Sequence, residues 1–456
     1  MLERPILFKK IGIRKDILRL VIPILIEQIL INSMGLINTM MASRLKGDEG
    51  ANVVAAISMI DSISNLLIAF FSALAIGGTV VVAQHVGRGD LSKANEGAKQ
   101  ALFSGLSISL LVTVILFIFK TPFLSKLYGD VEPIILNYGI SYLSIVGLSF
   151  PLLASILIGN GILRGAGNTS TSASVNILMN ICNISFTYYF LYISKLGILG
   201  AALGITLARL VGAIYVLFVL AKGKQDLHIE NYFYFKPNLP LLKQIFYVGI
   251  PASVESLVFH ACKLLTQTFI GQMGTVSMLS NSIANSITNM LNIPGNSLST
   301  AATTVVGQSI GRGNTDEAKQ DLLYMTRLAL VCLVALALLT LPFLRVLVSL
   351  FTNNPEALAY TTQILKLNAL AIPLWAFSFV LPAGLKGAGD GTYTMMTSMF
   401  GMWAFRVGLG YVLGITFKIG VAGIFIAMYI DWGVRGFLYY LRFKGSKWLK
   451  HRSEER

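Results

Sequence analysis

The sequence predicts an all-α membrane protein in which twelve transmembrane helices form two pseudo-symmetric six-helix bundles. Three observations lead to this fold class: the composition, a series of long apolar segments and an internal repeat. The chain has 456 residues, of which 55% are hydrophobic and 12% are charged, and soluble domains carry about twice that share of charge. Together with a mean hydropathy of +0.70, this composition excludes a large water-soluble enzyme and a disordered chain.

Twelve segments are long and apolar enough to cross a bilayer, which takes about 20 mostly apolar helical residues. Strands of a membrane barrel would be about 10 residues long and would alternate in polarity, which these segments do not. The first segment follows a basic N-terminus, but it is too long for a signal peptide and carries Pro23 and Glu27, so we expect it to remain as a span. The segments are 17–43, 53–83, 101–119, 134–158, 172–194, 197–220, 245–270, 277–306, 322–343, 362–384, 393–416 and 419–441.

The distribution of Lys and Arg predicts the orientation of these spans. With the N-terminus inside, the inner segments hold 24 of these residues and the outer segments hold 8. Positive residues concentrate in cytoplasmic loops, so both termini are expected in the cytoplasm of a multi-pass protein in the plasma membrane of a prokaryote. The formal charge of +15 then follows from topology, and no nucleic acid is expected as a partner.

The second half of the chain repeats the first, with three groups of matching residues in the same order and at nearly constant spacing. Such agreement is hard to obtain by chance. At a shift of 224, residues 58–67 match 282–291, and Gln84-His85-Val86-Gly87-Arg88-Gly89 matches Gln308-Ser309-Ile310-Gly311-Arg312-Gly313; at 222, Leu163-Arg164-Gly165-Ala166-Gly167 matches Leu385-Lys386-Gly387-Ala388-Gly389; at 228, Ile22-Pro23 and Glu27 match Ile250-Pro251 and Glu255.

This repeat divides the chain into two lobes of six spans each. Because six is even, both lobes enter the membrane from the same side, and an axis along the membrane normal should relate them, as in parallel-repeat transporters. The expected divisions are an N-terminal lobe at 1–221, a cytoplasmic linker at 222–244, a C-terminal lobe at 245–441 and a basic cytoplasmic tail at 442–456. Transporters of this build bind substrate between the lobes near the midplane.

Three carboxylates within the spans are candidates for binding a coupling ion: Glu255, Asp61 and Glu27. A charged side chain at the bilayer centre costs at least about 2.5–3.5 kcal/mol, so each should face the bundle interior or a wet cavity. Asp61 has Asn285 as its repeat mate, so only one lobe keeps the charge at this position. The alternative for each carboxylate is a structural hydrogen bond or ion pair between helices.

Ten further residues are candidates for lining a substrate cavity. Asn176, Asn180 and Asn183 share one helix face at i, i+4 and i+7, and amides are costly in lipid. Eleven residues separate Asn38 from Glu27, which puts them on one face of the first span. Packing between helices is the alternative for all of them. The candidates are Met34, Asn38, Asn176, Asn180, Asn183, His260, Lys263, Thr266, Asn285 and Asn289.

The sequence offers no basis for an enzyme, a metal site or a cofactor. The three cysteines lie in apolar segments and the four histidines form no convergent set, so neither a catalytic constellation nor a metal cluster is predicted. No G-x-x-x-x-G-K-[ST] motif occurs, and no loop is long enough for a nucleotide-binding domain, which argues against an ATP-driven pump.

With these motifs, the chain resembles the multidrug and toxic compound extrusion (MATE) family of secondary transporters. The resemblance is carried by six plus six spans, the Ile-Pro openings at Ile22 and Ile250, the two Gln-x-x-Gly-Arg-Gly loops and the two Leu-[Arg/Lys]-Gly-Ala-Gly loops. It implies a monomeric antiporter that exports amphipathic small molecules, cationic ones foremost, in exchange for H⁺ or Na⁺. The alternative is a lipid-linked oligosaccharide flippase of the same superfamily.

The chain departs from the family at the positions where members often carry ion-coupling carboxylates. Asn38, Ile184, Phe259 and Trp375 stand at or near these places. The family's coupling residues are therefore not carried over, and the sequence leaves H⁺ and Na⁺ open as coupling ions.

Overall fold

The protein consists of two helical lobes, which the computed structural model describes for all residues except 1–13, 44–47, 129–131, 224–227, 230–235 and 451–456. No strand occurs among the described residues. The N-terminal lobe contains α1 (Lys15–Ser43), α2 (Asp48–Arg88), α3 (Leu91–Leu127), α4 (Pro133–Leu148), α5 (Phe150–Gly165), α6 (Thr169–Tyr188), the π-helix η2 (Tyr189–Ile193) and α7 (Gly197–Lys222).

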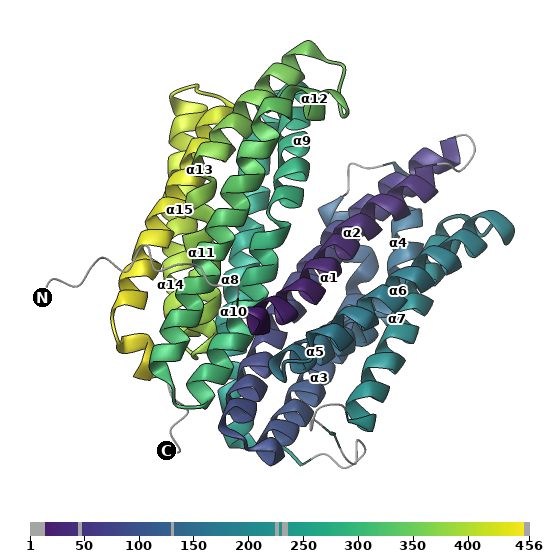
Figure 1. Cartoon of the computed structure of the whole chain (residues 1–456). Coiled ribbons are helices and arrows are strands. Elements are labelled where there is room, and N and C mark those ends of the chain that lie inside the picture. Colours follow the sequence, from purple (N-terminus) through teal and green to yellow (C-terminus); the bar gives the residue numbers. More distant parts are fainter. Residues whose placement is uncertain (1–13, 44–47, 129–131, 224–227, 230–235, 451–456) are drawn as a thin grey trace, which may run out of the picture.

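The C-terminal lobe, drawn from teal to yellow in Figure 1, contains α8 (Leu239–Gly271), α9 (Thr275–Leu291), α10 (Ile293–Gly311), α11 (Thr315–Thr340), the 3₁₀ turn η3 (Leu341–Phe343), α12 (Leu344–Ser349), α13 (Pro355–Gly387), α14 (Gly391–Gly401), the π-helices η4 (Met402–Leu409) and η5 (Val412–Thr416), α15 (Val421–Lys444) and the 3₁₀ turn η6 (Lys447–Lys450). It has its helix breaks at other places, at α9–α10 and α11–α12 instead of α4–α5.

The twelve-span, two-lobe fold predicted from the sequence is confirmed, because these helices join into twelve rods in the predicted order. In the described part of the chain, eight helices are long and apolar enough to span a membrane, and the pair α4–α5, bent by 48°, would be a ninth. The bend lies at Ser149, just before Pro151 in the first turn of α5, where proline is well tolerated. The other rods, formed by α1, α6 and α9–α10, carry more polar side chains.

The Gln-x-x-Gly-Arg-Gly motifs end one helix and start the next in each lobe. Gly89 and Gly313 both have φ of 77°, a conformation that favours glycine. Directly after them, the side chains of Asp90 and Asn314 accept hydrogen bonds from the backbone N–H three residues further on, and so cap α3 and α11. The repeated sequence therefore builds the same turn twice.

A second repeated turn separates the last two rods of each lobe. Lys195 and Lys418 both have positive φ, at 51° and 55°, and each follows a π-helix, η2 or η5. This turn divides the fifth span from the sixth, which the hydropathy of the segment alone hardly separates.

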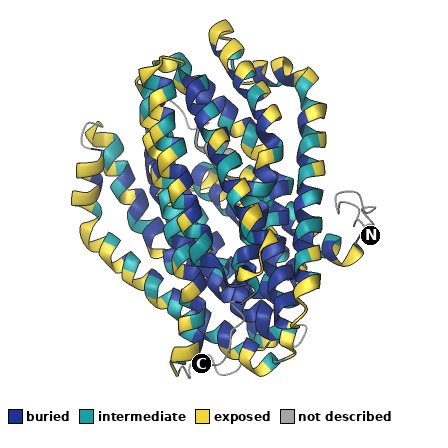
Figure 2. Cartoon of the chain, turned by 90° about the vertical axis from the view of Figure 1, so that its left-hand side faces the viewer, coloured by how far each residue is buried: buried dark blue, intermediate teal, exposed yellow. Residues whose placement is uncertain are grey.

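Large apolar side chains cover the outer faces of the lobes, as expected for surfaces in contact with lipid. On the peripheral helix α3, Leu111 and Ile118 are 61% and 66% exposed, and on its repeat mate α11, Leu338 and Leu339 are 63% and 67% exposed. Figure 2 shows exposed positions along the outside of the bundle and buried positions along the inner helices. The apolar exterior agrees with a protein embedded in a bilayer.

The lobes meet at one end of the molecule, which we call the closed end and define by the turns at residues 84–90 and 308–314. In Figure 1 the ribbons of the two lobes converge there and diverge towards α12. α2 packs against α8 and α10 of the other lobe, and α1 packs against α10. By the predicted topology, the closed end is cytoplasmic.

Each lobe lends the first turns of its first helix to the core of the other. Ile17, Val21 and Ile24 of α1 belong to the apolar core of the C-terminal lobe, and Leu241 and Ile245 of α8 belong to a core cluster of the N-terminal lobe. The bundles are therefore not simply side by side, because they cross over at the closed end.

Two helix ends lie inside the segments expected as linker and tail. α8 begins at Leu239, within 222–244, and α15 continues to Lys444, within 442–456. After α15, Trp448 is fully buried and its indole N–H donates to the carbonyl of Phe443 at 3.0 Å. The start of the tail thus packs against the C-terminal lobe.

Candidate functional site

Two glutamine side chains make reciprocal hydrogen bonds across the closed end. Gln84 Nε2 of α2 donates to the carbonyl of Gly387 at 3.1 Å, and Gln308 Nε2 of α10 donates to the carbonyl of Gly165 at 3.0 Å. Each bond joins the first position of a Gln-x-x-Gly-Arg-Gly motif to the Leu-[Arg/Lys]-Gly-Ala-Gly motif of the opposite lobe. The two motifs therefore act together as an interlobe contact.

Glycines in the same motifs allow the two backbones to approach closely. A Cβ atom added to Gly87 would overlap the backbone carbonyl of Gln308, and one added to Gly311 would overlap the backbone carbonyl of Gln84. A backbone atom cannot give way as a flexible side chain can, so any larger residue would force α2 and α10 apart.

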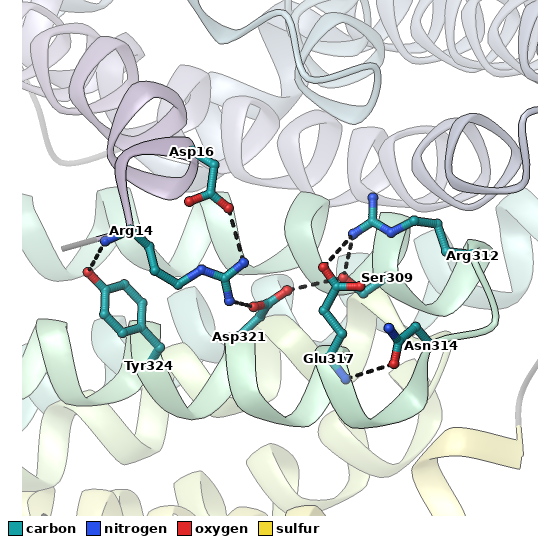
Figure 3. A network of polar contacts seen from close by, with 8 residues as sticks. All are labelled: Arg14, Asp16, Ser309, Arg312, Asn314, Glu317, Asp321 and Tyr324. Carbon is teal, nitrogen blue, oxygen red and sulfur yellow. Dashed lines mark hydrogen bonds and ion pairs between the residues drawn. The ribbon is translucent and has the colours of Figure 1, made fainter. Parts of the chain in front are cut away.

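A polar network around Asp321 adds a third interlobe contact (Figure 3). Arg14, just before α1, forms an ion pair with the buried carboxylate of Asp321 on α11. The second oxygen of Asp321 accepts a hydrogen bond from Ser309 Oγ at 3.1 Å. Ser309 Oγ in turn accepts a hydrogen bond from Arg312 Nη2 at 2.9 Å. Arg312 also pairs with Glu317 at 3.3 Å.

Glu27, one of the predicted ion-coupling carboxylates, is held in an ion pair within the N-terminal lobe. Its Oε1 lies 2.9 Å from the guanidinium of Arg164 on α5, and its Oε2 accepts a hydrogen bond from Ser172 Oγ at 3.3 Å. The basic residue is the one in the Leu-Arg-Gly-Ala-Gly motif, so the motif neutralises this buried carboxylate.

Glu255 makes the equivalent pair in the C-terminal lobe. Its Oε2 lies 2.8 Å from Lys386 Nζ of α13, and its Oε1 accepts a hydrogen bond from Ser398 Oγ at 2.9 Å. Glu27 thus accepts a charge-assisted hydrogen bond from Arg164, whereas Glu255 Oε2 forms an ion pair with Lys386 without hydrogen-bond geometry. Neither glutamate is available to an ion until its pair is broken.

Asp61 differs from these glutamates because, among the described residues, it has neither a hydrogen bond nor an ion pair. It lies on α2 and interacts electrostatically with Arg209 of α7 and with Tyr142 of α4. Arg209 is buried and donates to Ser149 Oγ at 2.7 Å. An acid and a base therefore share the interior of the N-terminal lobe without direct contact.

The predicted amide stripe of α6 also lies inside the N-terminal lobe. Asn176 Nδ2 donates to the carbonyl of Ser172 at 3.3 Å. The amides of Asn180 and Asn183 are buried, and both polar atoms of each have no partner among the described residues. Such amides need partners from water or a ligand.

A cavity of about 330 Å³ lies inside the C-terminal lobe, between α8, α9, α10, α13, η4 and α15. The substrate site expected between the lobes stays a prediction, because this cavity lies within one lobe. The size is at the lower end of the range for small-molecule sites. Its lining consists of Phe259, Lys263, Thr266, Gln267, Ile270, Asn281, Asn285, Thr288, Asn289, Asn292, Asn296, Trp375, Phe379, Arg406, Ile424, Phe425, Met428 and Trp432.

The charged groups of the lining are both cationic, Lys263 and Arg406. Behind the wall, Arg406 pairs with Asp431 at 3.2 Å, and Arg435 binds both oxygens of the same carboxylate at 2.7 and 2.9 Å. Asp431, Arg435 and Arg406 are 0%, 2% and 5% exposed. This triad of two bases and one acid leaves one positive charge uncompensated.

Four of the ten predicted cavity residues line this cavity: Lys263, Thr266, Asn285 and Asn289. His260 and the α6 amides do not line it. Asn38 does not either, although its side-chain oxygen is buried without a partner among the described residues. The side chain of Met34 lies outside the described residues. The predicted set therefore divides between two lobes rather than sharing one cavity.

Sequence reasoning missed Arg406 and the aromatic walls of the cavity as site residues. Arg406 is a charge in an apolar span, which is the signal that points to function in a membrane protein. Trp375 and Phe259 lie near positions where this chain departs from the family pattern, which was a second signal. The aromatic residues otherwise look like ordinary apolar span residues.

Comparison with known proteins finds relatives along almost the whole chain. A model of the MatE family matches residues 23–189 and again residues 251–412, one match in each lobe. The uncharacterized transporter YisQ of Bacillus subtilis is 28% identical over 433 residues, which cover 94% of this chain and 93% of that protein. A probable multidrug resistance protein NorM of Thermotoga maritima is 24% identical over 448 residues, covering 96% of this chain and 94% of that protein.

The fold also has solved counterparts. A crystal structure of a MATE protein in the bent conformation superposes with a TM-score of 0.88 at 22% sequence identity, and covers 96% of both chains. At this identity, the likeness establishes the fold, including the two-lobe arrangement, and leaves the chemistry of the site to be argued from the residues themselves.

Proposed function

This chain belongs to the MatE family, and on that premise we propose that it is a cation-coupled antiporter that exports amphipathic small molecules. Membership makes it a multi-pass membrane transporter rather than an enzyme. Relatives are named multidrug resistance proteins, which supports extrusion of drugs or related compounds. The coupling ion, H⁺ or Na⁺, the cytoplasmic position of both termini and a monomeric state belong to this proposal.

The observation that carries the transport mechanism is the closed end. Beside its apolar packing, this end has a pair of repeated polar contacts, since Gln84 and Gln308 each donate to a carbonyl of the opposite lobe. A rotation of one lobe against the other would break both bonds at once and open this end, as alternating access requires. Substrate would enter from the cytoplasm in that open state and leave on the other side when the end closes.

Asp61 is the carboxylate that we assign to the coupling ion. Glu27 and Glu255 are engaged by Arg164 and Lys386, whereas Asp61 has no such partner among the described residues. An unpaired carboxylate in a lobe interior binds H⁺ or Na⁺ more readily than one in an ion pair. The positive charge of Arg209 limits this affinity, which would help the ion to leave again.

The experiment uses purified protein in proteoliposomes loaded with a fluorescent amphipathic dye. An imposed gradient of H⁺ or of Na⁺, tested in separate runs, should drive dye across the membrane against its concentration gradient, and Asp61→Asn should abolish this uphill transport. Asp316→Asn, at an exposed position in the first turn of α11, is the matched control and should behave as wild type. If neither gradient moves any dye, the antiport proposal is wrong; if Asp61→Asn couples normally, the assignment of Asp61 is wrong.

Orientation has its own test, which uses single cysteines in a cysteine-free background. Lys93→Cys lies at the closed end and should react with an impermeant thiol reagent only from the cytoplasmic side. Lys46→Cys lies in the first predicted outer loop and should react only from outside. The reverse pattern would contradict the predicted topology.

A lipid-linked oligosaccharide flippase, the alternative considered from the sequence, finds no separate support in the site. The cavity of about 330 Å³ is small for an oligosaccharide headgroup, because single small-molecule sites already occupy about 300–1,000 Å³.

A further inference from the structure

We propose that the cavity of the C-terminal lobe binds amphipathic anions, that is, molecules with an aromatic or aliphatic body and a carboxylate or sulfonate head. This inference deepens the proposed function and rests on it as far as export is concerned. It replaces the cationic substrates expected from the family resemblance.

The first argument is the charge of the lining. Its eighteen residues include Lys263 and Arg406 and contain neither Asp nor Glu. Behind the wall, the carboxylate of Asp431 is bound by Nε and Nη2 of Arg435 as well as by Nη2 of Arg406. In a low-dielectric interior such an excess of positive charge attracts an anion and repels a cation.

The second argument is that both cations have donors to spare. Among the described residues, Lys263 Nζ has no hydrogen bond or ion pair. Arg406 Nε is buried without a partner, although its Nη2 holds Asp431. Buried charged donors without partners are costly, and an anionic head bound between them would supply the missing acceptors.

The third argument is that two of the five aromatic rings in the lining, those of Phe259 and Phe379, already face the protein's own cations. The guanidinium of Arg406 lies over the ring of Phe259 at 5.0 Å, and that of Arg435 lies over the ring of Phe379 at 5.4 Å. Trp375 stacks on Phe379 with ring centroids 4.6 Å apart. Cation–π binding of a cationic ligand needs free ring faces, whereas an apolar ligand body needs only apolar contact.

The amides complete the site without changing its charge. Asn285 Nδ2 donates to the carbonyl of Asn281 and to its side-chain oxygen, at 2.9 and 2.8 Å. Asn289 lies one turn further along the same helix and also lines the cavity. These groups fix the orientation of a polar head or of its hydrating water, and the choice between anion and cation is left to Lys263 and Arg406.

The test compares two probes that share one aromatic body, naphthalene-2-sulfonate and 2-naphthyltrimethylammonium. Binding to the purified full-length protein in detergent is measured by isothermal titration calorimetry, with quenching of tryptophan fluorescence as a second readout, because Trp375 and Trp432 line the cavity. The sulfonate should bind at least about tenfold more tightly than the ammonium compound, since one charge-assisted hydrogen bond contributes this much or more.

Lys263→Gln should weaken binding of the sulfonate about tenfold, and Lys263→Glu should reverse the preference between the two probes. Lys263 has no partner to lose among the described residues, so its substitution should leave the fold intact. Lys366→Gln, at an exposed position of α13 outside the lining, is the control and should bind as wild type. Equal or tighter binding of the ammonium probe, or unchanged sulfonate affinity in Lys263→Gln, would overturn the inference.

A transport assay with the same probes separates this inference from the proposed function. If the sulfonate binds as described but no H⁺ or Na⁺ gradient moves it, the antiport proposal fails and the anion site stands. If a gradient drives export of the ammonium probe with equal rates in wild type and Lys263→Gln, antiport stands and the anion site is wrong.

Discussion

The two lobes share a scaffold but differ in the charges of their interiors. Both hold a glutamate against the base of a Leu-[Arg/Lys]-Gly-Ala-Gly motif, and in both a glutamine donates a hydrogen bond to the opposite lobe. In the interior of the N-terminal lobe, however, Asp61 interacts electrostatically with Arg209. The interior of the C-terminal lobe holds Lys263, Arg406 and Asp431, which forms a salt bridge with Arg406. The repeated residues therefore serve assembly and motion, and the unrepeated ones serve binding.

Residues at equivalent positions make this difference concrete. Asp61 corresponds to Asn285 at the shift of 224, so the acid of one lobe is an amide in the cavity of the other. At the shift of 223, which aligns the two lysine turns, Arg406 corresponds to Asn183. The N-terminal lobe thus has an acid where the C-terminal lobe has an amide, and the C-terminal lobe has a base where the N-terminal lobe has an amide. This difference fits an ion site in one lobe and a substrate site in the other.

The largest expected effect comes from replacing Glu27 or Glu255. Either substitution should lower the free energy of unfolding, but by different amounts in the two lobes. Glu27→Gln leaves Arg164 unpaired in the interior and should lower the free energy of unfolding by about 3–5 kcal/mol. Glu255→Gln should cost less, because its side chain is 14% exposed against 3% for Glu27. Thermal unfolding of the purified variants measures both. A normal unfolding temperature together with lost coupling would instead assign ion binding to these glutamates.

Substitution of Gly87 or Gly311 at the closed end should give the next largest effect on transport, of equal size for the two lobes. Gly87→Leu and Gly311→Leu each force a side chain against a backbone carbonyl of the opposite lobe and should disfavour the closed conformation by about 1–3 kcal/mol or more. Dye export in proteoliposomes should fall by roughly 5–150-fold.

Gly147→Ala is the control for these variants, because a Cβ atom at Gly147 meets only Phe150 at an ordinary contact distance of 3.9 Å. Wild-type export in Gly87→Leu would show that α2 and α10 need not approach this closely during transport.

Removal of the interlobe hydrogen bonds of Gln84 and Gln308 should shift the opening equilibrium less than the glycine variants do, and the two shifts should be additive. Gln84→Leu and Gln308→Leu each remove one interlobe hydrogen bond and should shift the equilibrium away from the closed end by about 0.5–1.5 kcal/mol. The double variant should give about twice the shift. Labelling of a single cysteine placed at Ala83, which is buried in α2 beside Gly307 of the opposite lobe, reports opening of this end. A double variant no more open than either single variant would contradict the reciprocal role.

The smallest expected effect tests an interlobe contact without a repeat, the ion pair of Arg14 with Asp321. The equivalent of Asp321 at the shift of 224 is Gly97, and the equivalent of Arg14 at the shift of 228 is Leu242. The repeated positions therefore cannot form a second ion pair of this kind. Arg14 is about one-third exposed, so solvent screens its attraction for Asp321. The buried carboxylate of Asp321 also keeps its hydrogen bond from Ser309 Oγ when Arg14 is replaced. Arg14→Gln should therefore open the closed end slightly, and less so in high salt. A salt-independent effect as large as that of Gln84→Leu would contradict this ranking.

Much of the fold was predictable because its signals are local. Span length, the positions of capping residues such as Asp90 and Asn314, and the repeat are all written in short stretches of sequence. The candidate site was predictable only in part. Lys263, Thr266, Asn285 and Asn289 were found because polar side chains inside spans must face protein or water, but nothing in their spacing tells which lobe interior they enter or which helices face them.

The amino-acid sequence by itself determined twelve helical rods, two equivalent halves and the turns at their ends. The length of an apolar segment, the positive φ that glycine allows and the capping of a helix by Asp or Asn all depend on residues close together in the chain. Only the tertiary structure decided that Gln84 meets Gly387, that α1 joins the core of the opposite lobe and that Arg406 faces a cavity beside Lys263. Contacts such as that of Gln84 link residues about 300 positions apart, and packing of whole helices, rather than any local preference, selects them.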